Sequence, residues 1–255
     1  MQINMIGCII QARMGSTRLP GKVMKKLTES ETVLSYLINQ LQHSKKIDNL
    51  IIATTENQED DVILNFAKEN KINIFRGNSL DVLDRYYQCA KQFSCSSIVR
   101  ITADNPLIDP NIIDQAIDVF LKQSVDYISN CNPRTFPYGT EVEIFSFLAL
   151  EKIWKNAKKH SEREHVTPYF HNNKNGFKIS NIEFSENLSH LRWTVDREND
   201  LKLVKKIISE IKKRPILMQD IIQLISIKPE ILDINKNFIP NEGYLKSLNE
   251  DKLLF

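Results

Sequence analysis

A basic loop near the N-terminus carries the residue types that bind phosphate. The apolar run Met5–Gln11 leads into this loop, and up to Thr28 the chain holds five positive side chains and no negative one. These are Arg13, Arg18, Lys22, Lys25 and Lys26. Between them lie residues that offer close backbone approach or a hydroxyl donor, namely Gly15, Ser16, Thr17 and Gly21. Arginine can grip a phosphate through two N–H groups and lysine adds a compact charge, so the loop favours a polyphosphate ligand. The alternative is a solvated basic turn.

Two common phosphate-binding motifs do not fit this loop. A P-loop needs Gly-x4-Gly-Lys-Ser/Thr, whereas five residues separate Gly15 from Gly21 and Val23 stands at the hydroxyl position. A Gly-x-Gly-x-x-Gly dinucleotide motif is absent from the sequence.

Two acidic residues stand where a metal-binding carboxylate would be useful. Asp104 follows the apolar run Ile98–Thr102, and Asp196 follows Leu191–Val195. Mg²⁺ bound with a triphosphate takes one or two carboxylates beside phosphate oxygens and water. The residues alone leave alternatives open, because Asp104 could serve a turn and Asp196 could cap the next helix.

Other polar residues complete the set of candidates. Arg76 follows a third strand-like run, and Arg100 precedes Thr102 on the same face of its strand. In the less regular second half, the candidates for binding a second substrate are Arg134, Tyr138, Glu141, Glu143, Glu164, His165 and Arg192. No His-Glu-x-x-His or comparable spacing supports zinc, and His165 taken alone reads as an ordinary helix histidine. Asp81, Asp84 and Arg85 have helical spacings typical of a solvated, salt-bridged face.

Alternating elements in the first 130 residues must position these side chains. Apolar runs of strand length are Met5–Gln11, Leu50–Thr54, Ile72–Phe75, Ile98–Thr102 and Val125–Ser129. Amphipathic stretches between them are Thr32–His43, Glu59–Asn70, Leu80–Phe93 and Asn111–Gln123. This alternation predicts βαβ units and a mostly parallel sheet in an α/β fold.

The pattern changes after residue 130. Alternation predicts strands over Glu141–Phe145 and Lys178–Phe184, and Ser161-Glu162-Arg163-Glu164 has the form of a capping box that starts a helix. Another helix is expected over Asn199–Lys213, capped by Asp196 or Asn199. The tail from Pro229 shows no clear period. We expect one domain: a nucleotide-binding part in 1–130, a lid and dimerisation region in 131–190, and a metal-binding strand with C-terminal helices in 191–255.

The composition is that of an ordinary globular protein. The 255 residues are 42% apolar and 26% charged, with a net charge of +2 that gives no reason to expect a nucleic-acid or membrane partner. No apolar run approaches the roughly 20 residues of a membrane span. Cys8, Cys89, Cys95 and Cys131 lack a Cys-x-x-Cys pair and indicate reduced thiols in a cytoplasmic protein.

The motifs together resemble the sugar-acid cytidylyltransferases, which include CMP-Kdo and CMP-acylneuraminate synthetases, and most of all the spore-coat-polysaccharide branch of that superfamily. The matching segments are Ile9–Lys22, Arg100–Asp109, Thr135–Glu143, Arg163–Tyr169, Trp193–Leu201 and Asn241–Tyr244.

The resemblance implies a three-layer α/β/α, nucleotide-diphospho-sugar transferase-like (Rossmann-like) fold, with CTP and Mg²⁺ as ligands. It implies that Asp104 and Asp196 hold the metal, with Arg13 and Lys22 also catalytic. Nucleotide-binding positions would be Ala12, Arg13, Gly15, Ser16, Thr17, Arg18, Lys22, Arg76, Arg100 and Thr102. Thr102 departs from the Gln that helps the Kdo-type enzymes read cytosine.

The acceptor implied by the resemblance is a small sugar acid or a phosphorylated or phosphonate compound, used in surface polysaccharide synthesis by a homodimer. Two other classes compete with this hypothesis. A nucleotide-sugar-dependent glycosyltransferase is disfavoured because the sequence has no Asp-x-Asp motif. A non-catalytic nucleotide-binding protein would bind nucleotide without releasing pyrophosphate.

Overall fold

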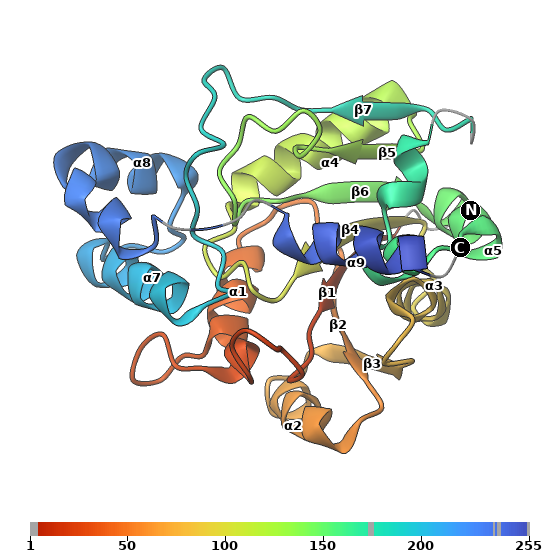
Figure 1. Cartoon of the computed structure of the whole chain (residues 1–255), viewed down its shortest axis with the longest axis horizontal. Coiled ribbons are helices and arrows are strands. Elements are labelled where there is room, and N and C mark those ends of the chain that lie inside the picture. Colours follow the sequence, from red (N-terminus) through yellow and green to blue (C-terminus); the bar gives the residue numbers. More distant parts are fainter. Residues whose placement is uncertain (1–4, 173–175, 237, 239–240, 254–255) are drawn as a thin grey trace.

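One mixed sheet runs through the whole molecule. The computed structural model describes residues 5–172, 176–236, 238 and 241–253. Within them the strands are β1 Ile6–Gln11, β2 Asn49–Thr55, β3 Asn73–Gly77, β4 Ser97–Thr102, β5 Tyr127–Ser129, β6 Glu143–Ser146 and β7 Ile179–Asn181. Their order is β3-β2-β1-β4-β6-β5-β7, and only β6 pairs antiparallel with its neighbours among these strands (Figure 1).

Helices cover both faces of the sheet and make the predicted three layers. They are α1 Val33–Leu41, α2 Asp61–Glu69, α3 Val82–Gln92, α4 Pro110–Gln123, α5 Phe147–Asn156, α6 His160–His165, α7 Glu198–Glu210, α8 Met218–Ile227 and α9 Glu242–Leu253. Successive side chains of a strand point to opposite faces. Thus Cys8 and Ile10 of β1 join the core under α1 and α4, whereas Ile9 joins the core under α3 and α5. Burial on both faces explains why the strands read as continuous apolar runs.

The strand order fixes where a ligand can bind. From β1 the chain moves outward through β2 and β3, and then returns to place β4 on the other side of β1. Ligands of open α/β sheets bind at the carboxyl ends of strands where the order reverses in this way. The basic loop follows β1 and Asp104 follows β4, so both lie at this position.

The predicted lid region is built into this sheet. Its strands β6 and β7 flank β5, and β6 also pairs with β4. The loop between β5 and β6 and the segment Pro168–His171 face the carboxyl end of the sheet. None of the described helices is both long and apolar enough to cross a membrane.

Two local predictions, on how helices begin, were wrong. Helix α6 begins at His160, and Glu162 rather than Glu164 accepts the backbone N–H of Lys159, at 3.2 Å. Neither Asp196 nor Asn199 caps α7, because the carboxylate of Asp200 accepts the N–H groups at that end. The tail contains a helix, α9, that no periodicity indicated, because its described buried side chains include Ser247 and Asp251 instead of an apolar stripe.

Candidate functional site

The basic loop is closed on itself by backbone contacts. Gly21 has a φ of 66°, a conformation that favours glycine, and its N–H donates to the carbonyl of Met14 at 3.0 Å. The N–H of Met14 donates to Asp60 Oδ1 at 2.6 Å, which ties the loop to the start of α2. The loop therefore presents its side chains from a fixed frame.

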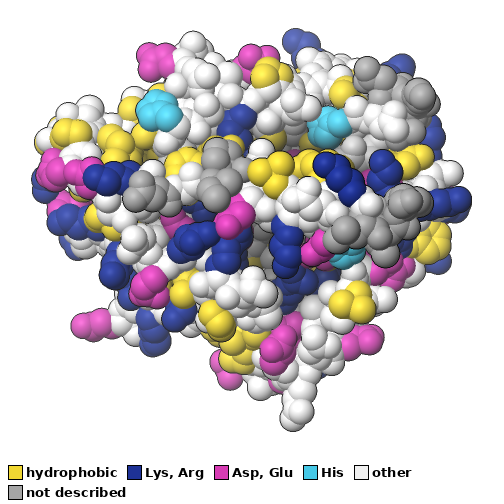
Figure 2. Space-filling view, viewed as in Figure 1, with side chains coloured by type: hydrophobic (Ala, Val, Ile, Leu, Met, Phe, Trp, Pro, Cys, Tyr) yellow, Lys and Arg dark blue, Asp and Glu magenta, His cyan; other side chains and the backbone are white. Residues whose placement is uncertain are grey.

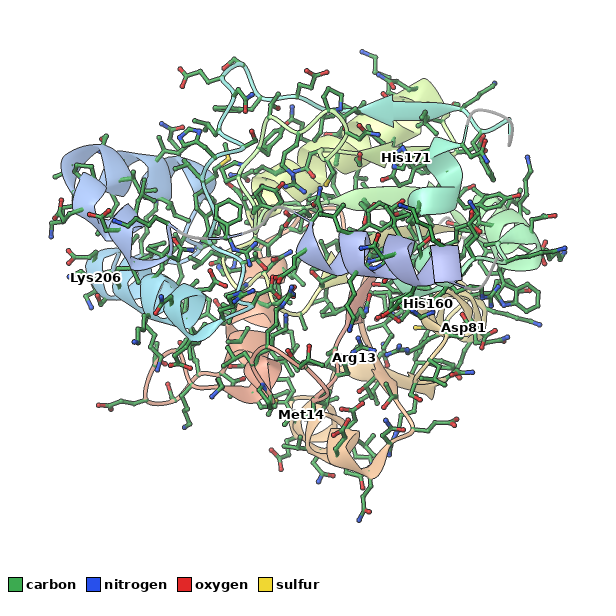
Figure 3. The ribbon with its side chains drawn as sticks, in the orientation of Figure 1. Arg13, Met14, Asp81, His160, His171 and Lys206 are labelled. Carbon is green, nitrogen blue, oxygen red and sulfur yellow. The ribbon has the colours of Figure 1, made fainter. Side chains whose placement is uncertain are left out.

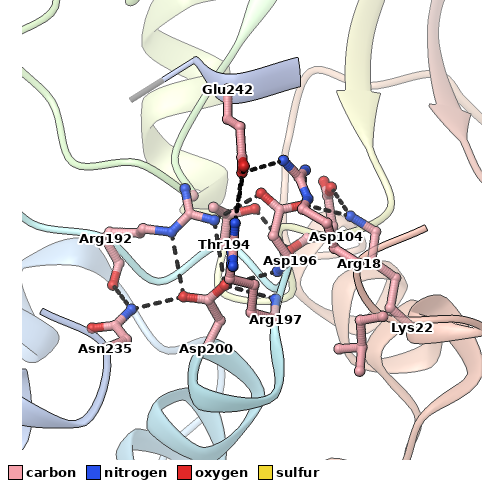
Figure 4. Close-up of polar contacts among 12 residues, drawn as sticks. Arg18, Lys22, Asp104, Arg192, Thr194, Asp196, Arg197, Asp200, Asn235 and Glu242 are labelled. Carbon is pink, nitrogen blue, oxygen red and sulfur yellow. Dashed lines mark hydrogen bonds and ion pairs between the residues drawn. The ribbon is translucent and has the colours of Figure 1, made fainter. Parts of the chain in front are cut away.

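Asp104 and Asp196 are brought together by the segment that follows residue 190. Val195 donates its N–H to the carbonyl of Asp104 at 2.8 Å, so the two acids lie on adjoining backbone. Between their carboxylates lies the ammonium of Lys22, 2.6 Å from Asp104 and 2.7 Å from Asp196 (Figure 4). Asp104 and Asp196 are 92 residues apart in sequence, yet both contact the ammonium of Lys22, which precedes Asp196 by 174 residues.

Asp196 is the most heavily engaged carboxylate of the site. Besides Lys22 it contacts Arg18 at 2.9 Å and Arg192 at 2.7 Å. Burial alone would raise the pKa of Asp196, but Lys22, Arg18 and Arg192 hold that pKa well below its ordinary value. Burial likewise lowers the pKa of Lys22, and the two carboxylates more than offset it, so the pKa of Lys22 is raised. Asp196 and Lys22 are therefore both charged at neutral pH.

This donor set fits a divalent metal ion. Two carboxylates that already converge on one cation match the oxygen ligands that Mg²⁺ takes together with phosphate oxygens and water. The role of Asp196 as a helix cap is excluded by its contacts, and Asp104 directs its carboxylate to Lys22 instead of a turn. No cluster of three or more His, Cys, Asp or Glu suited to a metal occurs in the described ranges, so water or the phosphate of a ligand would have to complete the coordination.

Two cavities meet at these acids. The loop cavity, of about 760 Å³, is walled by the basic loop, α6 and α9. The lid cavity, of about 590 Å³, is walled by the β5–β6 loop, the segment 165–171 and the segment 192–197. Residues on both walls include Arg18, Arg100, Thr102, Asp104, His165 and Asp196. Figure 2 shows Lys and Arg side chains gathered around a hollow near the centre of this face.

The loop cavity holds most of the predicted nucleotide-binding residues. Gly15, Ser16 and Thr17 line it with Lys22. Arg13, which follows β1 (Figure 3), donates to Glu164 at 2.9 Å. Glu164 therefore lines the loop cavity, and not the lid cavity with the other candidates for binding a second substrate.

Helix α9 adds residues to the loop cavity that the site prediction did not include. They are Glu242, Gly243, Lys246, Ser247 and Glu250. The carboxylate of Glu242 bridges Arg18 at 2.8 Å and Arg197 at 2.9 Å (Figure 4). The tail motif Asn241–Tyr244 was the sequence signal that could have placed them at the site.

The lid cavity contains arginines that are each held by an acid. Arg134 pairs with Glu141 at 2.7 Å and stacks on Tyr138, with 3.9 Å from the guanidinium carbon to the ring centre. Arg100 pairs with Glu143, which also accepts the hydroxyl of Tyr127 at 2.7 Å. These guanidinium groups therefore have fixed orientations.

Three predicted residues have other environments. Arg192 pairs with Asp196 at 2.7 Å and with Asp200 at 3.3 Å, although it also borders the lid cavity. Arg76 pairs with Asp61 at 2.7 Å and lines a separate surface cavity. Ala12 is buried, and its N–H donates to Ala53 at 3.1 Å.

His165 stands between the two cavities at the end of α6. Its Nε2 lies 3.0 Å from the hydroxyl of Ser247 in α9. Burial, followed by the charges of Arg100 and His160, lowers its pKa to about 4, so the ring is neutral at pH 7. It is a hydrogen-bonded helix histidine, as spacing alone suggested, and it also borders both cavities.

Comparison with known protein sequences identifies relatives along almost the whole chain. The sequence profile of the family described as Cytidylyltransferase matches residues 7–242. The chain is 42% identical to the uncharacterized protein MJ1063 of Methanocaldococcus jannaschii, over 90% of this chain and 93% of the relative. It is 32% identical to the spore coat polysaccharide biosynthesis protein SpsF of Bacillus subtilis, over 89% of this chain and 97% of the relative.

A solved structure shares both fold and sequence with this chain. It is a cytidylyltransferase from Leptospira borgpetersenii, with a TM-score of 0.86 and 36% sequence identity. The match covers 92% of this chain and 98% of that structure. The three-layer arrangement and the resemblance drawn from the motifs are thereby confirmed.

Proposed function

We propose that this chain, which belongs to the cytidylyltransferase family and is a CTP-using nucleotidyltransferase, transfers CMP to a small acidic acceptor with release of pyrophosphate. The observation that carries the proposal is the convergence of Asp104 and Asp196 on one cation, at the boundary between two cavities. One cavity would take the nucleotide and the other the acceptor.

The basic loop suits the triphosphate of CTP. Arg13, Arg18 and Lys22 reach the loop cavity from a frame fixed by the Gly21–Met14 contact. Each is now neutralised by a carboxylate, and phosphate oxygens would replace those carboxylates as partners. Cations held close to the phosphates stabilise the negative charge that develops on the pyrophosphate as it leaves.

The acceptor would attack from the lid cavity. A hydroxyl oxygen of the acceptor forms a bond to the α-phosphorus and releases its proton to water, while the bond to the pyrophosphate oxygen on the opposite side breaks. Holding both reactants in this geometry supplies much of the rate enhancement. The oriented guanidinium of Arg134 suits an acceptor carboxylate or phosphate, because arginine binds such groups through two parallel hydrogen bonds.

Asp104 and Asp196 would hold Mg²⁺ once Lys22 turns to the phosphates. When bound, the ion would offset the charge of the triphosphate and polarise its phosphorus–oxygen bonds. The lysine would then neutralise a phosphate oxygen in place of the acids.

The biological setting is proposed from the relatives. SpsF is named for spore coat polysaccharide biosynthesis, so we place this enzyme in the synthesis of a surface glycan. The resemblance further leads us to propose a cytoplasmic homodimer.

Pyrophosphate release provides the test. The purified protein is incubated with each of the four nucleoside triphosphates, Mg²⁺, and a panel of sugar acids and phosphorylated or phosphonate acceptors. We expect release with CTP and at least one acceptor, and its loss in Asp104→Asn. Nucleotide binding without release under all conditions would instead indicate a non-catalytic nucleotide-binding protein. Release of a nucleoside diphosphate from a nucleotide sugar would indicate a glycosyltransferase.

A further inference from the structure

The first residue of α9 places a carboxylate on the basic loop. Glu242 Oε2 lies 2.8 Å from Nη1 of Arg18, and both carboxylate oxygens of Glu242 accept from Nη2 of Arg197, at 2.9 and 3.0 Å (Figure 4). Arg18 and Glu242 line both cavities, and their side chains are 32% and 35% exposed. A ligand that enters either cavity can therefore reach this contact.

The two arginines differ in the carboxylates they have besides Glu242. The guanidinium of Arg18 also contacts Asp196, at 2.9 Å. Among the described residues, Glu242 is the only carboxylate that pairs with the guanidinium of Arg197, and it does so through two hydrogen bonds. A phosphate that takes Arg18 would therefore leave Glu242 still paired with Arg197. Exchanging one hydrogen bond of a carboxylate costs much less free energy than leaving that carboxylate without a partner.

The backbone of α9 is held in place further along the helix. The N–H of Ser161 in α6 donates to Asp251 at 3.0 Å, and Nε2 of His165 lies 3.0 Å from the hydroxyl of Ser247. Glu242 precedes both of these α9 residues by more than one helical turn. We therefore expect its side chain to move between the two arginines while the helix stays in place, and to return to the same position after a ligand leaves.

Glu242 carries its negative charge at neutral pH. The hydrogen bond from Arg197 lowers its pKa, and Arg18 adds to this effect against the opposing effect of burial. An arginine that holds the terminal phosphates of a nucleotide also holds the pyrophosphate after the bond to the α-phosphorus has broken, and product release limits the rate of many enzymes. A carboxylate that competes for Arg18 weakens the binding of triphosphate and pyrophosphate alike, and this loss of uniform binding does not lower the rate once the substrate is saturating.

We propose that Glu242 is the residue that helps pyrophosphate to leave. Its carboxylate stays on Arg197 alone while the terminal phosphates occupy Arg18, and it takes Arg18 back as the pyrophosphate departs. Arg197 is then a positioning residue, which acts through Glu242 and does not contact the phosphates. The inference rests on the proposed function and adds the group that empties the site before the next turnover.

The test measures the affinity of inorganic pyrophosphate and of CTP by calorimetry, with Mg²⁺ and without an acceptor. For Glu242→Gln we expect both ligands to bind about 3- to 10-fold more tightly, because one competing hydrogen bond between charged groups is removed. Pyrophosphate should also dissociate more slowly in stopped-flow measurements. Cytidine, which has no phosphate, should bind this variant as it binds the wild type.

Arg197→Gln distinguishes a positioning residue from a phosphate ligand. Without Arg197 the displaced carboxylate has no partner, so pyrophosphate should bind about 3- to 10-fold more weakly than to the wild type. When Glu242→Gln is added, the double variant should bind pyrophosphate as tightly as Glu242→Gln alone. An Arg197 that contacts the phosphates would instead make the double variant bind more weakly than Glu242→Gln.

Glu210→Gln is the matched control. Glu210 of α7 also pairs with two cations, Lys206 at 2.6 Å and Lys228 at 2.7 Å, and it lines neither the loop cavity nor the lid cavity. The substitution changes the net charge by the same amount as Glu242→Gln, and we expect the pyrophosphate affinity to stay within about twofold of the wild type, since salt screens distant charges. An equal gain in both variants would overturn the inference, because net charge would then explain the effect.

The outcomes separate this inference from the proposed function. Pyrophosphate that binds Glu242→Gln no more tightly than the wild type overturns the role of Glu242 and leaves the proposed function standing. A double variant that binds pyrophosphate more weakly than Glu242→Gln overturns the role of Arg197. Tighter pyrophosphate binding in Glu242→Gln, with no binding of CTP to either protein, would support the competition at Arg18 and contradict the proposed function.

Discussion

Replacing Lys22 by Met tests the arrangement at the centre of the site. The substitution keeps a chain of similar length and removes the ammonium that lies 2.6 Å from Asp104 and 2.7 Å from Asp196. Two carboxylates would then face each other without the cation that separates them.

The expected loss of stability follows from burial and from the remaining partners. The Lys22 side chain is 13% exposed, and those of Asp104 and Asp196 are 21% and 17% exposed. Removing one partner of a buried ion pair costs about 3–5 kcal/mol. Because Asp196 keeps Arg18 and Arg192 as partners, we expect the free energy of unfolding to fall by about 2–3 kcal/mol, which lowers the Tm by about 5–10 °C in a protein of this size.

A divalent cation should restore the positive charge that the Lys22 ammonium supplied between the two carboxylates. Mn²⁺ without nucleotide should raise the Tm of Lys22→Met by several degrees and that of the wild type little, because the lysine already fills the position. Saturation at 100 times Kd would give about 2.7 kcal/mol. Differential scanning fluorimetry with and without Mn²⁺ measures both effects. Activity with CTP should fall as well.

Lys206→Met provides the matched control for this experiment. Lys206 lies on α7, away from Arg13 and Met14 of the basic loop (Figure 3), and pairs with Glu210 at 2.6 Å on the surface. Such a pair contributes at most about 1 kcal/mol, and its loss creates no metal site. If Lys22→Met kept the wild-type Tm and gave no response to Mn²⁺ beyond this control, the two acids would not share a cation position, and the metal assignment would fail.

Two further predictions concern stability. Burial lowers the pKa of His165 to about 4, from about 6.5 in the unfolded chain, so the neutral ring's contribution to the free energy of unfolding is complete above pH 6.5. About 3 kcal/mol of this stability is lost as the pH falls toward 4. Urea unfolding at pH 7 and 4.5 should show a smaller loss of stability in His165→Gln than in the wild type, and equal losses would refute the assignment. Gly139→Ala should lower the free energy of unfolding in guanidinium by about 2–4 kcal/mol, because Gly139 has a φ of 104° and a new Cβ would lie 2.8 Å from the backbone N of Thr194. An unchanged unfolding midpoint would show that the turn can relax.

The layered fold was largely predictable because its strands are buried on both faces. The predicted run Met5–Gln11 corresponds to β1 at Ile6–Gln11, and Ile98–Thr102 corresponds to β4 at Ser97–Thr102. Helix α9 was not predictable in this way. Periodicity detects apolar faces, whereas α9 contacts α6 through polar pairs such as Ser161 with Asp251.

The site was predictable only as far as local signals reach. The rule that ligands bind where strands end placed Asp104 correctly beside the basic loop. The partners that neutralise the loop were not foreseeable, since Glu164 and Glu242 are 151 and 224 residues from the arginines they contact. The prediction of a solvated, salt-bridged face was wrong for Arg85, which is only 1% exposed in α3, because spacings of three and four residues do not reveal which side of a helix is buried.

The contact between Arg18 and Glu242 has a consequence for biosynthesis. The ribosome makes the basic loop before α9, and 224 positions separate Arg18 from Glu242. Contacts of such range form late in folding, because a long loop must be closed first. Until this contact forms, the guanidinium of Arg18 lacks the carboxylate of Glu242 as a partner. Once α9 docks, a phosphate can bind Arg18 only in competition with the carboxylate of Glu242, so the C-terminal helix tunes the affinity of a loop made far earlier in the chain.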